Sequence, residues 1–165
     1  MPQMEIRKKN KINKSSCYLA DFAEFKYHRG EKVLEIGCGA GTDSIEYALN
    51  NSKVSCIDLG EDQVELTRIN FKARNLDLVH SGPFEIIDAK NKKQLKNCIE
   101  KYEIDTVYLM AALLSATGEK FPQKAWDLNM NSLLAVLDLA KEKHIQQVYW
   151  PSSIAVFGPT TPKNS

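Results

Sequence analysis

The sequence predicts a three-layer α/β fold, in which a parallel sheet lies between two layers of helices. Short apolar segments alternate with longer amphipathic ones along the chain, and the short segments are apolar along their whole length. Strands of that kind belong to parallel sheets covered on both faces. A glycine-rich turn also follows the first strand and leads into a helix. With right-handed crossovers, these observations predict a doubly wound, Rossmann-like sheet of order 3-2-1-4-5 that ends after its fifth strand.

Each element follows from its hydrophobic period and its flanking residues. The expected strands cover residues 32–37, 53–58, 83–89, 105–112 and 146–153, and the expected helices cover 15–27, 42–51, 61–75, 91–103 and 122–144. The third strand has two candidates, residues 76–80 and 84–88, with Ser81, Gly82 and Pro83 between them. Because Gly-Pro breaks regular structure, only one of the two can be the central strand, and we choose the second.

Apolar residues at helical spacing predict the buried stripe of three of the helices. The expected stripes are Leu66, Ile69 and Ala73 in the first, Leu95, Cys98, Ile99 and Tyr102 in the second, and Trp126, Met130, Leu133, Leu137 and Ala140 in the third. The expected core thus lies between these stripes and the sheet.

Length and charge limit the partners of the protein. A chain of 165 residues suits a single domain, and its net charge of +1 favours neither nucleic acid nor a membrane surface as a partner. The basic residues 1–14 predict a flexible lead-in. The four cysteines and three histidines have no metal-ligand spacing, so no metal site is expected. Free thiols suit a reducing compartment, which predicts a cytoplasmic protein.

The residues that follow the first three strands predict a nucleotide site. Glycines at positions 37, 39 and 41 let the backbone approach a ligand closely, and the next helix offers free N–H groups. Asp58, with Leu59 beside it, closes the second strand and is placed to bind ribose hydroxyls. Asp88 and Ala89, at the end of the third strand, can reach an adenine edge. We therefore expect Gly37, Gly39, Gly41, Asp58, Leu59, Asp88 and Ala89 to bind a cofactor.

The glycine spacing favours one cofactor over another. The loop is G-x-G-x-G preceded by Glu35, and it is not G-x-G-x-x-G. A carboxylate at Glu35 would repel a pyrophosphate but could pair with a cationic ligand. S-adenosylmethionine carries a sulfonium and an amino group and no phosphate, so the residues favour it over NAD as the cofactor.

The first part of the chain resembles class I S-adenosylmethionine-dependent methyltransferases. E-I-G-C-G-A-G-T-D, from Glu35 onwards, is similar to their first motif, and I-D-L with Asp58 is similar to their ribose-binding carboxylate. The resemblance covers about residues 15–78. It implies that Glu35 and the glycine loop contact the methionine part of the cofactor.

The later part of the chain resembles another family. The stretches S-G-P-F-E-I-I-D-A-K-N, Y-L-M-A-A-L-L-S-A-T-G-E-K and V-Y-W-P-S-S-I-A-V-F-G look like NAD-dependent L-threonine dehydrogenases of the extended short-chain dehydrogenase and epimerase family. The resemblance covers about residues 79–165 and implies that Ala111, Ala112 and Leu113 border NAD and that Ser153 is the active-site hydroxyl. No Tyr-x-x-x-Lys pair follows Ser153, so dehydrogenase activity is not expected.

We interpret the chain as a chimera joined near residues 75–82, within one Rossmann-like domain over 1–165. The main hypothesis is a methyltransferase-like domain that binds S-adenosylmethionine with weak or no catalysis. One alternative is an NAD-binding fragment of an L-threonine dehydrogenase or epimerase-like protein, and another is a folded chimera without a ligand. The fifth strand would lie at an open sheet edge, with Trp150 and Phe157 exposed nearby, which predicts self-association through that edge.

Overall fold

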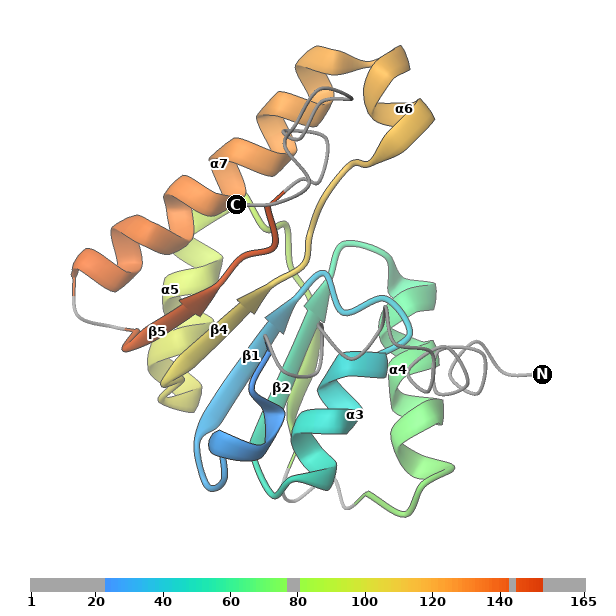
Figure 1. Ribbon diagram of the computed structural model, residues 1–165, viewed down its shortest axis with the longest axis vertical. Helices are drawn as coiled ribbons and strands as arrows, with labels where there is room; N and C mark the ends of the chain where they lie inside the picture. The colour runs from blue at the N-terminus through green and yellow to red at the C-terminus, as the bar shows by residue number, and fades with distance from the viewer. Residues whose placement is uncertain (1–22, 77–80, 143–144, 153–165) are drawn as a thin grey trace, which may run out of the picture.

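The protein folds into a five-stranded, wholly parallel sheet with helices on both faces (Figure 1). The computed structural model describes residues 23–76, 81–142 and 145–152. The strands are β1 (Lys32–Ile36), β2 (Lys53–Asp58), β3 (Ser81–Ile86), β4 (Thr106–Leu109) and β5 (Gln147–Tyr149). The helices are the 3-10 turn η1 (Phe25–Tyr27), α3 (Thr42–Leu49), α4 (Glu61–Lys72), α5 (Lys92–Tyr102), α6 (Ser115–Lys120) and α7 (Pro122–Lys141).

The predicted strand order is confirmed, because the strands lie in the order β3-β2-β1-β4-β5. The second candidate for the third strand forms β3, although it begins at Ser81 and so includes Gly82 and Pro83. The register between β2 and β3 shifts at this point, because Ser81 pairs with Val54 and Phe84 pairs with Cys56. A bulge on an edge strand tolerates a proline that cannot donate a ladder hydrogen bond, which explains why Gly-Pro does not end the strand.

Helices α5 and α7 lie on one face of the sheet and α3 and α4 on the other (Figure 1), and each face has its own core. On one face, α5 and α7 pack over aliphatic strand residues such as Leu34, Ile36 and Leu109. On the other face, α3, α4 and η1 pack over a core rich in rings, in which Phe25 and Tyr108 both contact Tyr47 edge to face. Alternation along β1 divides its side chains between these cores.

The predicted helix stripes are confirmed in α5, wrong in α4 and wrong in part in α7, where Leu133 and Ala140 pack against the core as expected. Leu95, Cys98 and Ile99 are buried, as expected for α5. In α4 the sheet is contacted by Val64, Thr67 and Phe71, and Leu66 and Ile69 are exposed. In α7 the buried residues are Ser132, Ala135, Val136 and Leu139, while Trp126 is 68% exposed and Leu137 is 46% exposed. The face of α7 that contacts the sheet therefore carries small and medium-sized side chains, and the larger Trp126 lies outside.

The N-terminal part of the described chain is hydrogen-bonded to β5, an edge strand of the sheet. Most of the helix expected over 15–27 lies outside the described residues, and residues 25–27 form η1. The buried His28 places Nδ1 2.6 Å from Glu31 Oε2 and Nε2 3.2 Å from the hydroxyl of Tyr149 in β5.

Across the ranges given above, no helix has the length and apolarity that a membrane span requires.

Candidate nucleotide-binding site

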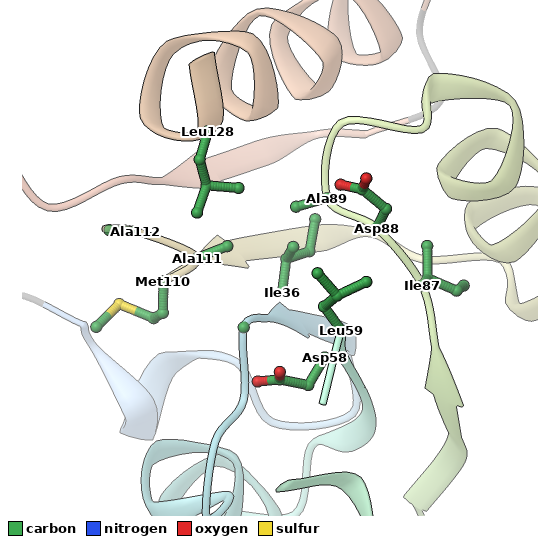
Figure 2. A pocket seen from close by; sticks show the side chains of 11 residues that line it. Ile36, Asp58, Leu59, Ile87, Asp88, Ala89, Met110, Ala111, Ala112 and Leu128 are labelled. Atoms are coloured by element: carbon green, nitrogen blue, oxygen red, sulfur yellow. The ribbon is translucent and has the colours of Figure 1, made fainter. Parts of the chain in front are cut away.

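A cavity of about 220 Å³ opens at the carboxyl ends of β1, β2 and β4. This is the point where strand order reverses, and ligands of doubly wound sheets bind there. Figure 2 shows Leu128 extending from α7 over Ala111, with Asp58 on the opposite side. The lining residues are Ile36, Gly37, Asp58, Leu59, Ile87, Asp88, Ala89, Met110, Ala111, Ala112 and Leu128, so seven of the predicted site residues come together.

Gly37 is required by the close approach of two strand ends. Its φ of +82° is one that residues with a side chain rarely adopt. A Cβ at this position would lie 2.5 Å from the backbone nitrogen of Ala111, in the loop after β4. The loop after β1 can therefore meet the loop after β4 only with glycine here, and this contact forms the floor of the cavity.

Asp58 holds the loops on both sides of it. The N–H of Gly39 donates to Oδ2 at 3.0 Å, and the N–H of Gly60 donates to Oδ1 at 3.0 Å. A carboxylate has about four acceptor positions, so each oxygen can still accept a hydrogen bond from a ligand. This carboxylate is thus fixed in place at the mouth of the cavity, as a ribose-binding group requires.

Gly39 and Gly41 support the loop without lining the cavity. Thr67 Oγ1 donates to the carbonyl of Gly39 at 2.8 Å, and a Cβ at Gly41 would lie 2.6 Å from Thr67 Cγ2. Asn70 Nδ2 also donates to the carbonyl of Ala40 at 2.9 Å. The side chains of α4 therefore fix the shape of the loop from behind.

Glu35 lies on the other side of the sheet from the cavity. It is 3% exposed and accepts hydrogen bonds from the N–H of Ser44, at 3.0 Å, and from the Ser44 hydroxyl. Burial raises the pKa of this carboxyl well above its ordinary value, and the nearby Asp43 raises it further. Glu35 thus anchors the first turn of α3, and the described cavity lining does not include it.

Asp88 and Ala89 line the cavity from the loop after β3, as expected. Asp88 Oδ1 accepts a hydrogen bond from the N–H of Lys90 at 2.9 Å, which closes a turn before α5. Among the described lining residues there is no lysine or arginine, so their side chains present two carboxylates and otherwise apolar groups.

Sequence reasoning missed several lining residues and one that supports them. Ile36, Ile87 and Leu128 form apolar walls, and period-two alternation after Glu35 could have placed Ile36 on the cavity side. Asn129 of α7 was also missed: its side chain accepts from the N–H of Leu113 at 2.7 Å and donates to the carbonyl of Leu113 at 3.2 Å. Ser153 lies outside the described residues.

The chain is similar to proteins of one family. Residues 45–165 match the NAD dependent epimerase/dehydratase family. An uncharacterized epimerase/dehydratase of Staphylococcus saprophyticus is 45% identical over 111 residues, which cover 67% of this chain and 34% of that protein. A similar protein of Staphylococcus haemolyticus is 46% identical over 85 residues, 52% of this chain and 26% of that protein. The chain therefore spans about a third or less of the length of these relatives.

Solved structures agree with this assignment. A GalE-like L-threonine dehydrogenase from Cupriavidus necator, in its holo form, is 38% identical with a TM-score of 0.62, and the match covers 81% of this chain and 41% of that one. The enzyme from Clostridium difficile is 31% identical, with a TM-score of 0.58 and coverage of 82% and 40%. A UDP-glucose-4-epimerase from Stenotrophomonas maltophila with bound NAD is 21% identical at a TM-score of 0.65, covers 82% and 40%, and supports the fold alone.

These matches overturn the prediction of S-adenosylmethionine as the cofactor. The family match begins at residue 45, inside the segment that resembles methyltransferases, and it is to a family that depends on NAD. The resemblance of residues 15–78 to methyltransferases has no support among these matches, and the join near 75–82 stays a prediction. The physical reason for the error is Glu35, which carried the argument for a cationic ligand and is buried beneath α3. The chain belongs to the NAD dependent epimerase/dehydratase family.

Proposed function

We propose that this chain forms the NAD-binding part of a protein similar to L-threonine dehydrogenases and epimerases. The observation that carries the proposal is Asp58, which lines the cavity at the end of β2 with both oxygens positioned by backbone N–H groups. Such a carboxylate accepts hydrogen bonds from ribose hydroxyls, and these hydrogen bonds distinguish a nucleoside from an apolar ligand of similar size. The family match supports NAD as the nucleotide.

The cavity suits the nucleoside half of the cofactor. Its volume of about 220 Å³ is smaller than the pockets that enclose whole ligands of drug size, which begin near 300 Å³. Leu59, Ala89 and Ala111 provide the apolar walls that an adenine ring requires, and Asp88 lies where a polar ring edge could reach it. The described residues would thus hold the adenosine part.

The pyrophosphate would depend on the backbone. The described part of the cavity lining has no basic side chain, and the N–H groups of Gly37, Cys38 and Gly39 already donate within the protein. The charge of the pyrophosphate would therefore be met by the positive N-terminal end of the α3 dipole. Gly37 and Gly39 both have positive φ, which turns the loop tightly before this helix. We further propose that a protein containing this domain oxidises a sugar nucleotide or an amino acid, and that Ser153 contributes its hydroxyl to that reaction.

Calorimetric titration of the 165-residue chain with NAD, NADH and S-adenosylmethionine tests the proposal. We expect NAD to bind and Asp58→Ala to weaken it about tenfold or more, the effect of one hydrogen bond to a charged group. Asp62→Ala, on the exposed side of α4, is the matched control and should bind NAD normally. Binding of S-adenosylmethionine without binding of NAD would overturn the proposal.

A second variant separates loss of the site from loss of the fold. Asp58 also holds Gly39 and Gly60, so its removal lowers stability as well as affinity. Ala112 lines the cavity from an exposed position and has no such role. Ala112→Leu should therefore occlude the cavity and weaken NAD binding while the melting temperature stays within about 2 °C of the unchanged protein.

A further inference from the structure

Two walls of the cavity come from segments that are far apart in the sequence. Asp88 and Ala89 belong to the loop between β3 and α5, and Leu128 belongs to the first half of α7. Figure 2 shows Leu128 on α7 and, beside it in this view, Ala89 on the loop. The width of the cavity therefore depends on how this loop is held relative to α7.

An ion pair joins the two segments right next to these lining residues. Lys90 directly follows Ala89 in the loop. Asp127 directly precedes Leu128 in α7, and its Oδ2 accepts a hydrogen bond from Lys90 Nζ at 2.6 Å. This hydrogen bond raises the pKa of Lys90 and lowers the pKa of Asp127, so both groups stay charged around neutral pH.

Each partner is itself held by its own segment. The N–H of Lys90 donates to Asp88 Oδ1 at 2.9 Å, and the N–H of Asn91 donates to the carbonyl of Asp88 at 2.9 Å, which closes a turn. On the other side, Asp127 lies within α7, and its Oδ1 accepts a hydrogen bond from Asn131 at 2.7 Å, so Oδ2 is the oxygen that Lys90 uses. The ion pair thus connects a tight turn to a helix.

We propose that the pair of Lys90 and Asp127 is a clasp that fixes the spacing between Ala89 and Leu128, and that it thereby positions these two walls on the adenine ring of the bound nucleotide. The inference rests on the proposed function, because it concerns the same cavity. Neither charged residue is among the described lining residues, so both act as positioning residues.

The clasp should act on binding more than on stability. The side chains of Lys90 and Asp127 are 35% and 51% exposed, and ion pairs at such positions contribute little to the stability of a fold. Binding is more sensitive, because a wall that is already in place loses less conformational freedom when the ligand arrives. A flat ring also needs both walls at contact distance, since the attraction between apolar atoms falls steeply with separation.

The charge of Asp127 separates the clasp from a purely electrostatic role. A carboxylate near the cavity repels the negatively charged pyrophosphate of NAD, so by charge alone Asp127→Ala should strengthen NAD binding and should not affect adenosine, which is uncharged. The clasp predicts the opposite sign for NAD and an equal effect on adenosine, because both ligands contain the adenine ring.

Calorimetric titration of the 165-residue chain with NAD and with adenosine tests the two roles. Asp127→Ala should weaken the binding of both ligands by the same factor, about two- to fivefold. Asp138→Ala is the matched control, since Asp138 is on the same helix, pairs with Lys92 at 3.1 Å and is not among the described lining residues. It should leave both affinities unchanged.

Variants of the lysine test whether the two residues act together. Lys90→Met should weaken both ligands by a factor similar to that of Asp127→Ala. The double variant should bind no more weakly than either single variant, because all three lack the same hydrogen bond. Lys90→Arg keeps a long cationic side chain and should bind both ligands as the unchanged protein does, whereas additive losses in the double variant would show that the residues act separately.

The outcomes distinguish failure of the clasp from failure of the proposed function. Stronger NAD binding by Asp127→Ala, a loss for NAD alone, or unchanged affinity for both ligands would refute the clasp and leave NAD binding intact. If the unchanged chain binds adenosine but not NAD, the proposed function fails and adenosine still tests the clasp.

A measurement without any ligand decides the clasp if neither ligand binds. The N–H of Asn91 closes the turn that carries Lys90. Its hydrogen exchange, followed by NMR, should be about two to five times faster in Asp127→Ala than in Asp138→Ala, because the turn has lost its link to α7. Equal exchange rates in the two variants would show that the ion pair does not hold the loop.

Discussion

The two faces of the sheet bury different chemistry. The face under α5 and α7 holds an aliphatic core, and its helices are joined at the surface by exposed ion pairs such as Lys92 with Asp138 and Glu142. The face under α3 and α4 buries Glu35, Ser44, Thr67 and two thiols among aromatic rings. Both faces have fully buried side chains, yet the polar groups that hold the glycine loop lie on only one of them.

This difference follows from what each face must position. The cavity opens on the side of α7, where its walls are mostly apolar and where Asn129 is the polar side chain that holds the loop after β4. The glycine loop has few side chains of its own, and its conformation is set by polar groups behind it, on α3 and α4. Substitutions of buried apolar residues on the aliphatic face should therefore change stability alone, while those of the polar groups that hold the cavity loops should also change binding or pH dependence.

The largest loss of stability should come from the aliphatic face. Leu95→Ala removes a fully buried side chain of α5 and should lower the free energy of unfolding by about 3 to 4 kcal/mol, because the cavity left behind adds to the lost burial. Urea denaturation measures this. Leu137→Ala, on α7 at 46% exposure, is the control and should cost less than about 0.5 kcal/mol. Equal losses in the two variants would contradict the assignment of the core.

The next largest loss of stability should come from a substitution in the glycine loop after β1. Gly37→Ala should lower the free energy of unfolding by about 2 to 3 kcal/mol, because it adds a clash with Ala111 to an unfavourable φ. Gly30→Ala is a matched control, since Gly30 has a φ of +83° but no atom within 4 Å of the added Cβ.

Gly30→Ala should cost about 1 kcal/mol, the conformational part alone. Denaturation of both variants therefore isolates the clash as the difference between them. NAD affinity should fall only in Gly37→Ala, and a similar loss of affinity in Gly30→Ala would show that the effect is not local to the cavity.

The sequence alone predicts the sheet and about half of the residues that line the cavity. Particular residues show why the rest could not be predicted. Strand order and the placement of Asp58 follow from hydrophobic runs and from the spacing of residues along the chain, which are local features. The buried faces of α4 and α7 do not, because Thr67 and Ser132 are buried by what they contact and not by their own hydrophobicity. Glu35 was misassigned for the same reason, since only the packed structure shows Ser44 beside it.

A smaller effect is expected at Asn129, the polar support on the α7 side. Asn129→Ala leaves the N–H and the carbonyl of Leu113 without their side-chain partner, which should cost about 1 to 2 kcal/mol and loosen the neighbouring Ala111 and Ala112. NAD affinity should fall about threefold in calorimetry, an effect of under about 1 kcal/mol. Asn131→Ala is the control on the same helix, because the Asn131 side chain bonds the exposed Asp127 and no loop.

The smallest effect should be the pH dependence of stability that comes from Glu35. Burial raises the pKa of this carboxyl above its ordinary value of 4.5, so the folded protein holds the proton more tightly than the unfolded chain does. Between those two pKa values the folded state binds more protons, and the free energy of unfolding falls as pH rises, by at most about 1.4 kcal/mol per pH unit for one group. Below the ordinary pKa both states hold the proton, so the free energy of unfolding no longer changes with pH through this group.

Glu35→Gln keeps an acceptor for the N–H of Ser44 but does not titrate, so its free energy of unfolding should depend less on pH above 4.5 than that of the unchanged protein. Urea denaturation at a series of pH values from about 4 to 8 measures the two slopes. Glu61→Gln, in the exposed first turn of α4, is the control and should keep the original slope. If Glu35→Gln kept it as well, the pH dependence would arise elsewhere, and the polar face would differ from the aliphatic one in its hydrogen bonds alone.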